Sequence, residues 1–359
     1  MEPGLRRHRY IAIKAEKFAV YGGLQETVFQ RKSNIPVRVD PTRWPMSCPI
    51  DSAPRIVSLL ASATEILYGL GLADQTVAVS HECDYPPACR DKPQVTLSAI
   101  DSAASSLQID NEVRGRLEAS TNLYTVDEGK LLALKPDMIV TQDQCDVCAV
   151  SLDQVRQLVT SADALAGTSI VALNPQSLKD VLADIRRLAK LTNTEQAGED
   201  WLSELQARIT AVRAKTDPLL ATERPRVICI EWTEPLMVAG NWTPELLSWA
   251  GGVAGLATEG EHSQYHEWSE ILNFDPEVIV VAPCGFDLHR SQSEAEALKQ
   301  LPGWYDTAAQ QQDRVFVMDG NAYLNRSGPR LVDTLEVLAS VIHPQLFPAA
   351  PSSSIHRLH

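Results

Sequence analysis

The chain alternates short apolar runs with longer segments of helical periodicity from residue 54 onward. The apolar runs at 55–60, 76–80, 137–142 and 168–173 are rich in Val and Ile, which is typical of buried strands. Strands that are apolar along their whole length, with helices between them, favour a parallel sheet covered by helices on both faces. The first half of the chain therefore predicts an α/β lobe.

The second half repeats this pattern. Its run at 224–232 ("RPRVICIEW") is similar to the run that begins the first half. The stretches "KPDMIVTQDQC" (135–145) and "DPEVIVVAPC" (275–284) share a proline and an acid before the strand and a cysteine after it. This weak internal repeat predicts a second lobe of similar α/β design.

A helical segment separates the two halves. In residues 174–216, Leu202, Leu205, Ile209 and Val212 fall on one face at helical spacing. A helix from about 194 to 216 would be roughly 33 Å long, enough to bridge two lobes as a rigid connection. The alternative is an ordinary surface helix within one domain.

These patterns predict an α/β protein of two lobes with mainly parallel sheets flanked by helices, joined by a long rigid helix. We predict five segments: an irregular N-terminal extension (1–52), an N-terminal lobe (53–174), a helical connection (175–217), a C-terminal lobe (218–347) and a C-terminal tail (348–359).

Charge and apolar content limit the possible partners. The chain carries 32 basic and 46 acidic residues, a net charge of −14, and Lys and Arg cluster only in the first nine residues. This balance argues against nucleic acid and anionic membrane surfaces as partners. No stretch approaches the ~18–20 apolar residues that span a bilayer, so we expect no membrane insertion.

The N-terminal stretch and the cysteines bear on the compartment. Residues 1–32 lack the continuous apolar core of a signal peptide, and the seven cysteines do not form an even disulfide framework. We therefore expect reduced thiols and a cytoplasmic protein, or a periplasmic or cell-surface one if the start codon is misassigned.

Polar and aromatic residues collect just after the predicted strands. Ligands of open α/β sheets bind beyond the carboxyl ends of the strands, so these residues predict a large pocket between the lobes. On the first lobe they are His81, Glu82, Cys83, Asp84, Tyr85, Cys145 and Cys148, and on the second Trp232, Trp242, Cys284, Phe286, Tyr323, Asn325 and Arg326.

The same residues leave a metal site open as an alternative. His81, Cys83, Cys145 and Cys148 would supply the four nitrogen and sulfur ligands of zinc if their loops meet, as in a zinc-dependent, chelatase-like enzyme. A cysteine that follows a strand is otherwise usually a small buried hydrophobe. No nucleophile stands beside a base and no phosphate-binding glycine loop is present, so we identify no catalytic residues and no required cofactor.

Several stretches resemble one protein family. "PRIVSLLASATEILYGLGLADQTVAVSHECDYPP", "LLALKPDMIVTQDQCDVCAVS", "GNWTPELLSWAGG", "DPEVIVVAPCGF" and "NRSGPRLVDTLEVLA" occur in order over about residues 53–347. They are similar to the cobalamin (vitamin B12)-binding proteins of ABC uptake systems. These are class III, helical-backbone relatives of the periplasmic iron-siderophore and haem binders.

The resemblance implies a binding protein, not an enzyme, with cobalamin held between the lobes by aromatic rings and polar groups. The residues from His81 to Tyr85 and from Cys145 to Cys148 would line one wall, and the second-lobe residues named above the other. His81 is a candidate axial ligand of cobalt, since imidazole binds cobalt well. Haem and iron-siderophores are the alternative ligands, although an anionic siderophore would favour more basic residues than Arg326 and Arg290.

The resemblance also implies an ABC permease as partner, and we expect a monomer. Glu65 and Glu245 occupy corresponding helix-opening positions and are candidates for docking to the permease. Glu65 is equally the expected partner of Ser62 in a capping box at the helix start.

Overall fold

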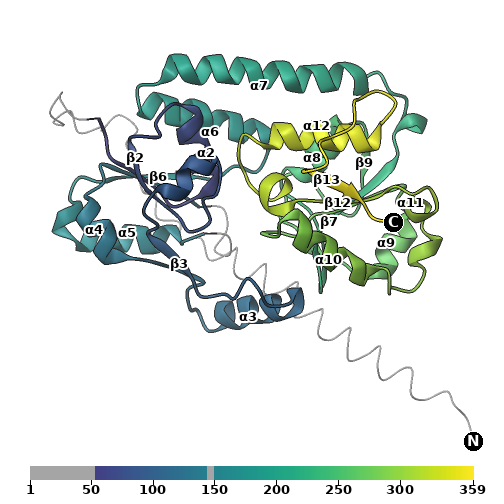
Figure 1. Cartoon of the computed structure of the whole chain (residues 1–359), viewed down its shortest axis with the longest axis horizontal. Helices are drawn as coiled ribbons and strands as arrows, with labels where there is room; N and C mark the ends of the chain where they lie inside the picture. The colour runs from purple at the N-terminus through teal and green to yellow at the C-terminus, as the bar shows by residue number, and fades with distance from the viewer. Residues whose placement is uncertain (1–52, 144–148) are drawn as a thin grey trace, which may run out of the picture. The chain divides into compact units, whose positions relative to one another are not determined.

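The computed structural model describes residues 53–143 and 149–359, all of which belong to one compact unit that runs from 49 to 359. Within the described residues, two separate larger sheets form the centres of two lobes (Figure 1). One sheet is built from residues 56–173 and the other from residues 226–357. The predicted α/β fold with mainly parallel sheets is confirmed.

The sheet of the N-terminal lobe is parallel throughout. Its strand order is β2-β1-β5-β6, with Val57 of β1 opposite Ile139 of β5. These two side chains are fully buried, as expected for strands covered on both faces. The elements are β1 (Ile56–Ser58), α2 (Ala61–Gly69), β2 (Thr76–Val79), α4 (Glu128–Leu134), β5 (Met138–Gln142), α5 (Leu152–Ser161) and β6 (Ser169–Leu173).

A small antiparallel ribbon and a helix extend this lobe. The ribbon pairs β3 (Thr96–Ser98) with β4 (Tyr124–Val126), and α3 (Ser106–Glu118) lies between them in sequence. Ser105 and Gln108 form a capping box at the start of α3. The apolar pattern does not predict this helix, although the "SSLQ" spacing at 105–108 carries the capping signal.

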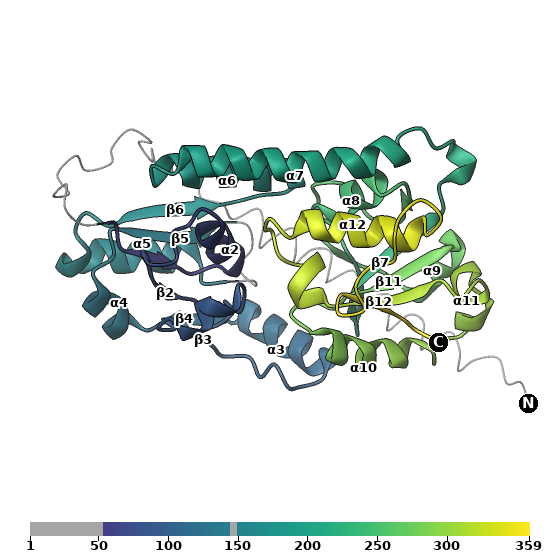
Figure 2. The same cartoon turned by 45° about the horizontal axis from the view of Figure 1, so that its top comes forward.

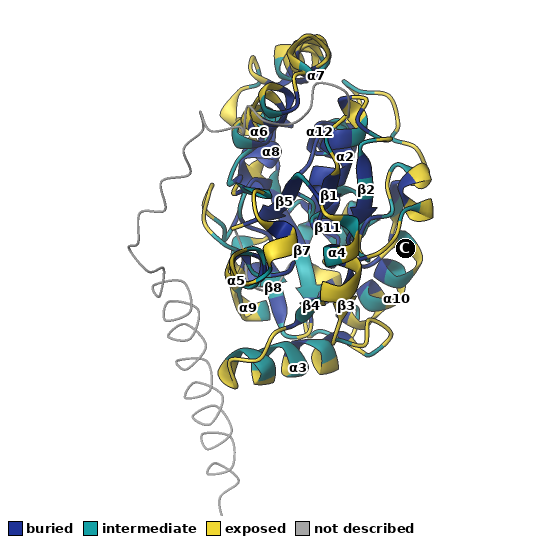
Figure 3. Cartoon of the chain, turned by 90° about the vertical axis from the view of Figure 1, so that its left-hand side faces the viewer, coloured by how far each residue is buried: buried dark blue, intermediate teal, exposed yellow. Residues whose placement is uncertain are grey.

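Two helices connect the lobes. They are α6 (Leu178–Leu191) and α7 (Glu195–Thr216), and α7 extends along both lobes (Figure 2). The predicted apolar face of the long helix is confirmed, because Leu202, Leu205, Ile209 and Val212 are all buried. Its opposite face is exposed (Figure 3).

The sheet of the C-terminal lobe is mixed. Parallel strands β7, β11 and β12 form its centre, and antiparallel strands lie toward its edges in the order β10-β8-β7-β11-β12-β13. Residues after 347, expected to be a tail, contribute the edge strand β13, which pairs with β12. The strands are β7 (Arg226–Thr233), β8 (Leu236–Val238), β9 (Val253–Ala254), β10 (Gln264–Tyr265), β11 (Val278–Val281), β12 (Val315–Met318) and β13 (Ile355–Arg357).

Helices cover both faces of this sheet. They are α8 (Thr243–Trp249), α9 (Trp268–Phe274), α10 (Leu288–Leu298), α11 (Ala308–Gln311) and α12 (Leu331–Ile342). One core cluster surrounds Trp304, which is fully buried and stacks on Trp268 with 5.7 Å between ring centroids. A rigid core of this kind holds the carboxyl ends of β7, β11 and β12 in fixed positions.

Candidate functional site

The loop after β2 meets the loop after β12, and we call this contact between residues 80–86 and 320–330 the seam. Arg326 donates to a carboxylate oxygen of Asp84 at 2.5 Å and to the Glu82 carbonyl at 3.2 Å. The Asn321 side-chain amide donates to the second oxygen of Asp84 at 2.9 Å. Although burial alone would raise the pKa of Asp84, Arg326 and Asn321 hold that pKa below its usual range. The predicted residues Glu82, Asp84 and Arg326 are therefore brought together across the two lobes.

A second ion pair lies behind the first. Arg330 donates to both carboxylate oxygens of Glu65, at 3.0 and 2.6 Å, and Arg326 lies 3.7 Å from the same carboxylate. The side chain of Glu65 is only 2% exposed. Burial raises the pKa of Glu65, and the two arginines oppose that rise. Because the N-cap of α2 is Leu60 and has no side-chain cap, the capping box predicted for Ser62 and Glu65 is wrong.

Close packing accompanies these charges. The hydroxyl oxygens of Ser62 and Ser327 lie 3.4 Å apart across the lobes. A Cβ at Gly328 would approach the Ser62 side chain to 3.1 Å, so the glycine lets the start of α12 lie against α2. On the same side, the Arg330 guanidinium lies 4.2 Å from the ring centroid of Tyr85, which is 44% exposed.

His81 is held in a fixed orientation. Its Nδ1 lies 2.6 Å from the Thr96 hydroxyl, and its ring centroid lies 5.5 Å from that of Tyr124. Its Nε2 lies 3.1 Å from a carboxylate oxygen of Glu82, whose pKa is lowered by this contact. The imidazole is thus anchored through one nitrogen, while the other faces only a half-exposed carboxylate.

The cysteines give little support to a zinc site. Cys83 is buried against the Thr64 hydroxyl at 3.0 Å, and burial raises the pKa of its thiol to about 12. Such a thiol stays protonated and is a poor metal ligand. No group of three or more His, Cys, Asp or Glu in residues 53–143 and 149–359 is placed to hold a metal. Cys145 and Cys148 lie outside the described residues.

The aromatic residues of the C-terminal lobe divide into two layers. Trp242 and Phe286 are buried, each 6% exposed, and Trp242 donates from its indole to the Leu324 carbonyl at 2.7 Å. Trp232 and Tyr323 keep partial exposure, and the ring of Trp232 packs on Phe286 with 5.2 Å between centroids. The outer pair is therefore accessible to a ligand, and Phe286 of the inner pair supports Trp232.

Two further predicted residues flank this aromatic group. Asn325 donates to the carbonyls of Ala282 at 2.8 Å and Gly320 at 3.2 Å, so its side chain fixes the turn after β12. Cys284 is an exposed cysteine after β11. Asn325 therefore shapes the site, whereas Cys284 lies at its surface.

Glu231 belongs to this region but was not among the predicted site residues. It sits at an irregularity in the register between Ile230 and Trp232 near the end of β7. Burial raises the pKa of its carboxyl to about 7, and a hydrogen bond with Ser263 opposes the rise. The acid within the apolar run "VICIEW" was the signal that could have identified it.

Glu245 is also buried. It is 6% exposed and accepts a hydrogen bond at 2.9 Å from the backbone N–H of Leu178, the first residue of α6. This contact ties α8 to the interlobe connection. Neither Glu65 nor Glu245 lies on an outer surface, so the structure gives their predicted docking role no support.

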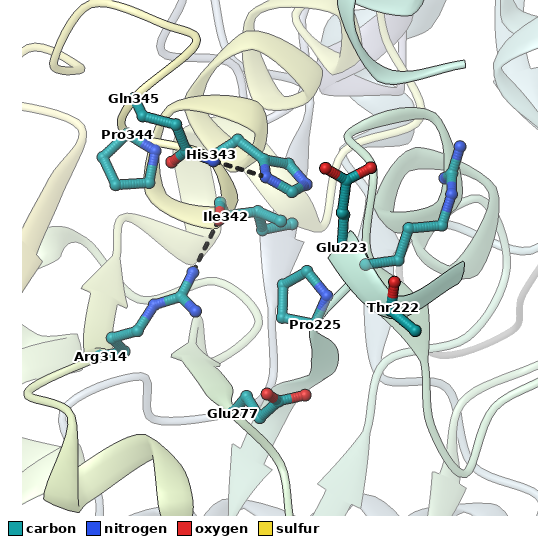
Figure 4. Close-up of a pocket in the computed structure, with 10 residues that line it drawn as sticks. Thr222, Glu223, Pro225, Glu277, Arg314, Ile342, His343, Pro344 and Gln345 are labelled. Carbon is teal, nitrogen blue, oxygen red and sulfur yellow. Dashed lines mark hydrogen bonds between the residues drawn. The ribbon is translucent and has the colours of Figure 1, made fainter. Parts of the chain in front are cut away.

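A separate pocket of about 360 Å³ lies at the other end of the C-terminal lobe (Figure 4). It is lined by residues just before β7 and β12, such as Pro225 and Arg314, and by the end of α12. Arg314 donates there to the carbonyls of Val341 at 3.3 Å and Ile342 at 2.7 Å. Because these groups cap a helix at the amino ends of the strands, we assign the pocket a structural role.

Comparisons with known proteins bear on the family and the fold. The family model for periplasmic binding proteins matches residues 56–322. The uncharacterized ABC transporter substrate-binding lipoprotein YvrC of Bacillus subtilis is 24% identical, covering 82% of this chain and 81% of its own. The vitamin B12-binding protein of Vibrio cholerae is 25% identical, covering 81% of this chain and 89% of its own.

Solved structures share the fold. The vitamin B12-binding protein BtuF of Vibrio cholerae superposes with a TM-score of 0.59 and 22% identity, over 81% of this chain and 97% of its own. The haem-binding protein RhuT of Roseiflexus superposes with a TM-score of 0.61 and 22% identity, over 82% of this chain and all of its own. At this identity the structural likeness establishes the architecture alone.

The comparisons also correct the expected compartment. A cytoplasmic setting is wrong, because the matching family is that of periplasmic binding proteins and the relatives include a substrate-binding lipoprotein. The composition of residues 1–32 was not a sound basis for predicting the cellular compartment. Within the described residues, no helix is both long and apolar enough to cross a membrane.

The expectation of a binding protein, and not an enzyme, is confirmed by the family. Two α/β lobes, a long connecting helix and polar loops that meet between the lobes are the features of a ligand-binding architecture. The family model covers most of both lobes. The chain belongs to the periplasmic binding protein family.

Proposed function

We propose that this protein is the substrate-binding component of an ABC importer and that it carries a corrinoid of the cobalamin class between its lobes. The relatives named vitamin B12-binding proteins support the ligand class, and the substrate-binding lipoprotein supports the permease partner. We expect a single chain to bind one ligand.

The observation that carries this proposal is the charge balance at the seam. Arg326 and Arg330 are both neutralised, by Asp84 and Glu65. Haem propionates and most ferric siderophores are anionic and would require unpaired positive charge in the pocket. Cyanocobalamin is neutral and carries many amide groups, so it suits a site of paired charges and scattered hydrogen-bond partners.

The accessible aromatic rings fit the same ligand. Trp232 and Tyr323 on one lobe, with Tyr85 on the other, offer flat apolar faces to a large ring system. Polar groups of Glu82 and Asn321 lie beside them at the seam. A corrin needs this combination, because its face is apolar and its edge carries amides.

Haem is the second candidate, because the orientation of His81 is compatible with an axial ligand of either iron or cobalt. Imidazole coordinates both iron and cobalt, and the Thr96 contact leaves Nε2 as the nitrogen available for a metal once Glu82 moves away. The change His81→Ala tests this role. Loss of a spectral shift on ligand binding would assign His81 as the axial ligand, whereas an unchanged spectrum would remove it from the site.

The experiment that tests the proposal is an absorbance titration of the purified full chain. Cyanocobalamin, hydroxocobalamin and haemin are each titrated, with ferric citrate as an anionic control. We expect saturable binding of both corrinoids and none of ferric citrate. Saturable binding of haemin alone would replace the corrinoid with haem, and no binding of either would exclude both.

A further inference from the structure

Residues 99–119 leave the N-terminal lobe after β3 and return to it at β4, and we call this segment, which contains α3, the strap. Between those points α3 lies beside α10 of the C-terminal lobe, on the opposite side of the lobes from α7 (Figures 1 and 2). Hydrogen bonds join α10 to the residues of the strap just before α3. The strap therefore belongs to one lobe by sequence and contacts the other.

The strap is held to the C-terminal lobe by polar contacts. Arg290 of α10 donates to the carbonyls of Ala104 at 2.7 Å and Ala103 at 3.4 Å. The Tyr265 hydroxyl donates to a carboxylate oxygen of Asp110 at 2.7 Å. The hydroxyl oxygens of Ser106 and Thr233 lie 3.3 Å apart.

The burial of α3 depends on these contacts. Ser106 and Asp110 are its two buried residues, and both face the C-terminal lobe. The remaining side chains of α3 are exposed or half-buried, and its one apolar stripe, Ile109, Val113 and Leu117, is only half-buried. Each such hydrogen bond contributes only a modest net free energy. A helix held mainly by a few of them can detach from the C-terminal lobe without disturbing the core of either lobe.

Arg290 links the strap to the aromatic residues of the candidate site. Its guanidinium lies 4.5 Å from the ring centroid of Phe286, the ring that supports Trp232. It also pairs with Glu294 at 2.7 Å, and Glu294 accepts a hydrogen bond from Thr233 at 3.0 Å. Arg290 thus contacts the strap and the aromatic layer directly, and it is linked to the end of β7 through Glu294.

We propose that the strap closes the space between the lobes on the side opposite α7 and must undock from the C-terminal lobe before a ligand can load. Arg290 is the positioning residue that couples the docked strap to Phe286. Because the strap spans both lobes, its release also frees the lobes to separate on that side. This inference rests on the proposed function only in placing the ligand between the lobes.

A reversible cross-link tests the loading step. The double change Ser106→Cys and Thr233→Cys places two thiols where side-chain oxygens now lie 3.3 Å apart, so that rotation of the side chains brings the sulfurs toward bonding distance. Mass spectrometry confirms the bond, and each single variant is a control for the other cysteines of the chain. We expect the oxidised protein to bind cyanocobalamin at least tenfold more slowly than the reduced one. Equal loading rates would overturn the proposal.

A second measurement needs no ligand, so it separates this inference from the proposed function. Tyr265→Phe removes only the hydroxyl that binds Asp110, and Tyr305→Phe at a tyrosine that is 62% exposed is the matched control. We expect amide hydrogen exchange across 106–118 to rise at least fivefold in Tyr265→Phe, with α4 unchanged. Unchanged exchange in the strap would show that these contacts do not hold it, whatever ligand the protein binds.

Discussion

Arg326 and Asp84 form an ion pair across the seam although 242 residues separate them in the chain. Arg326 is only 10% exposed, and Asp84 is one-third exposed. The pair joins the loop after β2 of one lobe to the loop after β12 of the other. It therefore holds the lobes together at the point where the ligand is proposed to bind.

A double-mutant cycle on this pair measures the coupling between the lobes. The changes Asp84→Asn and Arg326→Gln remove the charges and leave polar side chains, of the same size for Asn and shorter for Gln. We expect a coupling free energy of about 1–3 kcal/mol in urea unfolding, since the pair is largely desolvated. The exposed pair Arg357 and Asp313 is the control and should couple more weakly. Equal coupling in both cycles would mean that the seam pair contributes no more than a surface contact.

Glu65→Gln tests the buried ion pair behind the seam. The change leaves Arg330 with a buried charge and no carboxylate partner, so unfolding free energy should fall by about 3 kcal/mol. Glu245→Gln is the control, because that carboxylate accepts one backbone hydrogen bond and its loss should cost about 1 kcal/mol. If both variants lose the same unfolding free energy, burial of the carboxylate, and not its contact with Arg330, determines the loss.

Asp184 of α6 predicts a pH effect on stability. It is 9% exposed, one of its carboxylate oxygens has no hydrogen-bond partner in the described part of the chain, and burial raises its pKa to about 6. The folded state then binds the proton more tightly than the unfolded state. The stability contributed by the protonated form is therefore lost as pH rises from about 4 through 6.

Asp184→Asn removes this titration. The variant should gain stability over the native protein as pH rises from 4.5 to 7.5, by about 1–2 kcal/mol. Thermal unfolding at the two pH values measures the difference. A constant difference between the two proteins across this range would show that Asp184 does not titrate with a raised pKa.

Arg208 joins the connecting helix to the C-terminal lobe. It donates to Glu336 of α12 at 3.0 and 2.6 Å and also pairs with Asp333. Because these side chains are about one-third exposed, Arg208→Ala should lower unfolding free energy by only about 1 kcal/mol. Arg186→Ala, at a more exposed pair with Glu199, is the control. A smaller effect in Arg208→Ala than in the control would exclude Arg208 as a stabilising link between α7 and α12.

Elements with a strong periodic signal were predictable from the sequence. The strands β1, β2, β5, β6, β7 and β11 and the long helix α7 lie where the apolar pattern placed them. The strands are buried on both faces and the helix along one stripe, and both kinds of burial produce a regular apolar pattern in the sequence. The strap was not predicted, because the apolar stripe of α3, Ile109, Val113 and Leu117, is short and only half-buried, and its capping box is the clearest signal.

The long-range partners of the charged residues also could not be predicted from the sequence. Glu65 was expected at a surface or in a capping box, yet it pairs with Arg330, 265 residues away. Nothing in the stretch "NRSGPR" indicates that carboxylates of the other lobe neutralise its two arginines. Pairing of this kind is a property of the folded arrangement, whereas local spacing records only contacts within one element.

Calorimetric titration with cyanocobalamin tests the central claim most directly, because it reports affinity and stoichiometry together. The native protein is compared with Trp232→Ala at the proposed site and with Tyr305→Ala at an exposed tyrosine outside it. We predict one ligand per native chain, at least tenfold weaker binding in Trp232→Ala, which corresponds to about 1.4 kcal/mol, and unchanged binding in Tyr305→Ala. No saturable binding by the native protein, or equal affinity in all three, would contradict a corrinoid site between the lobes.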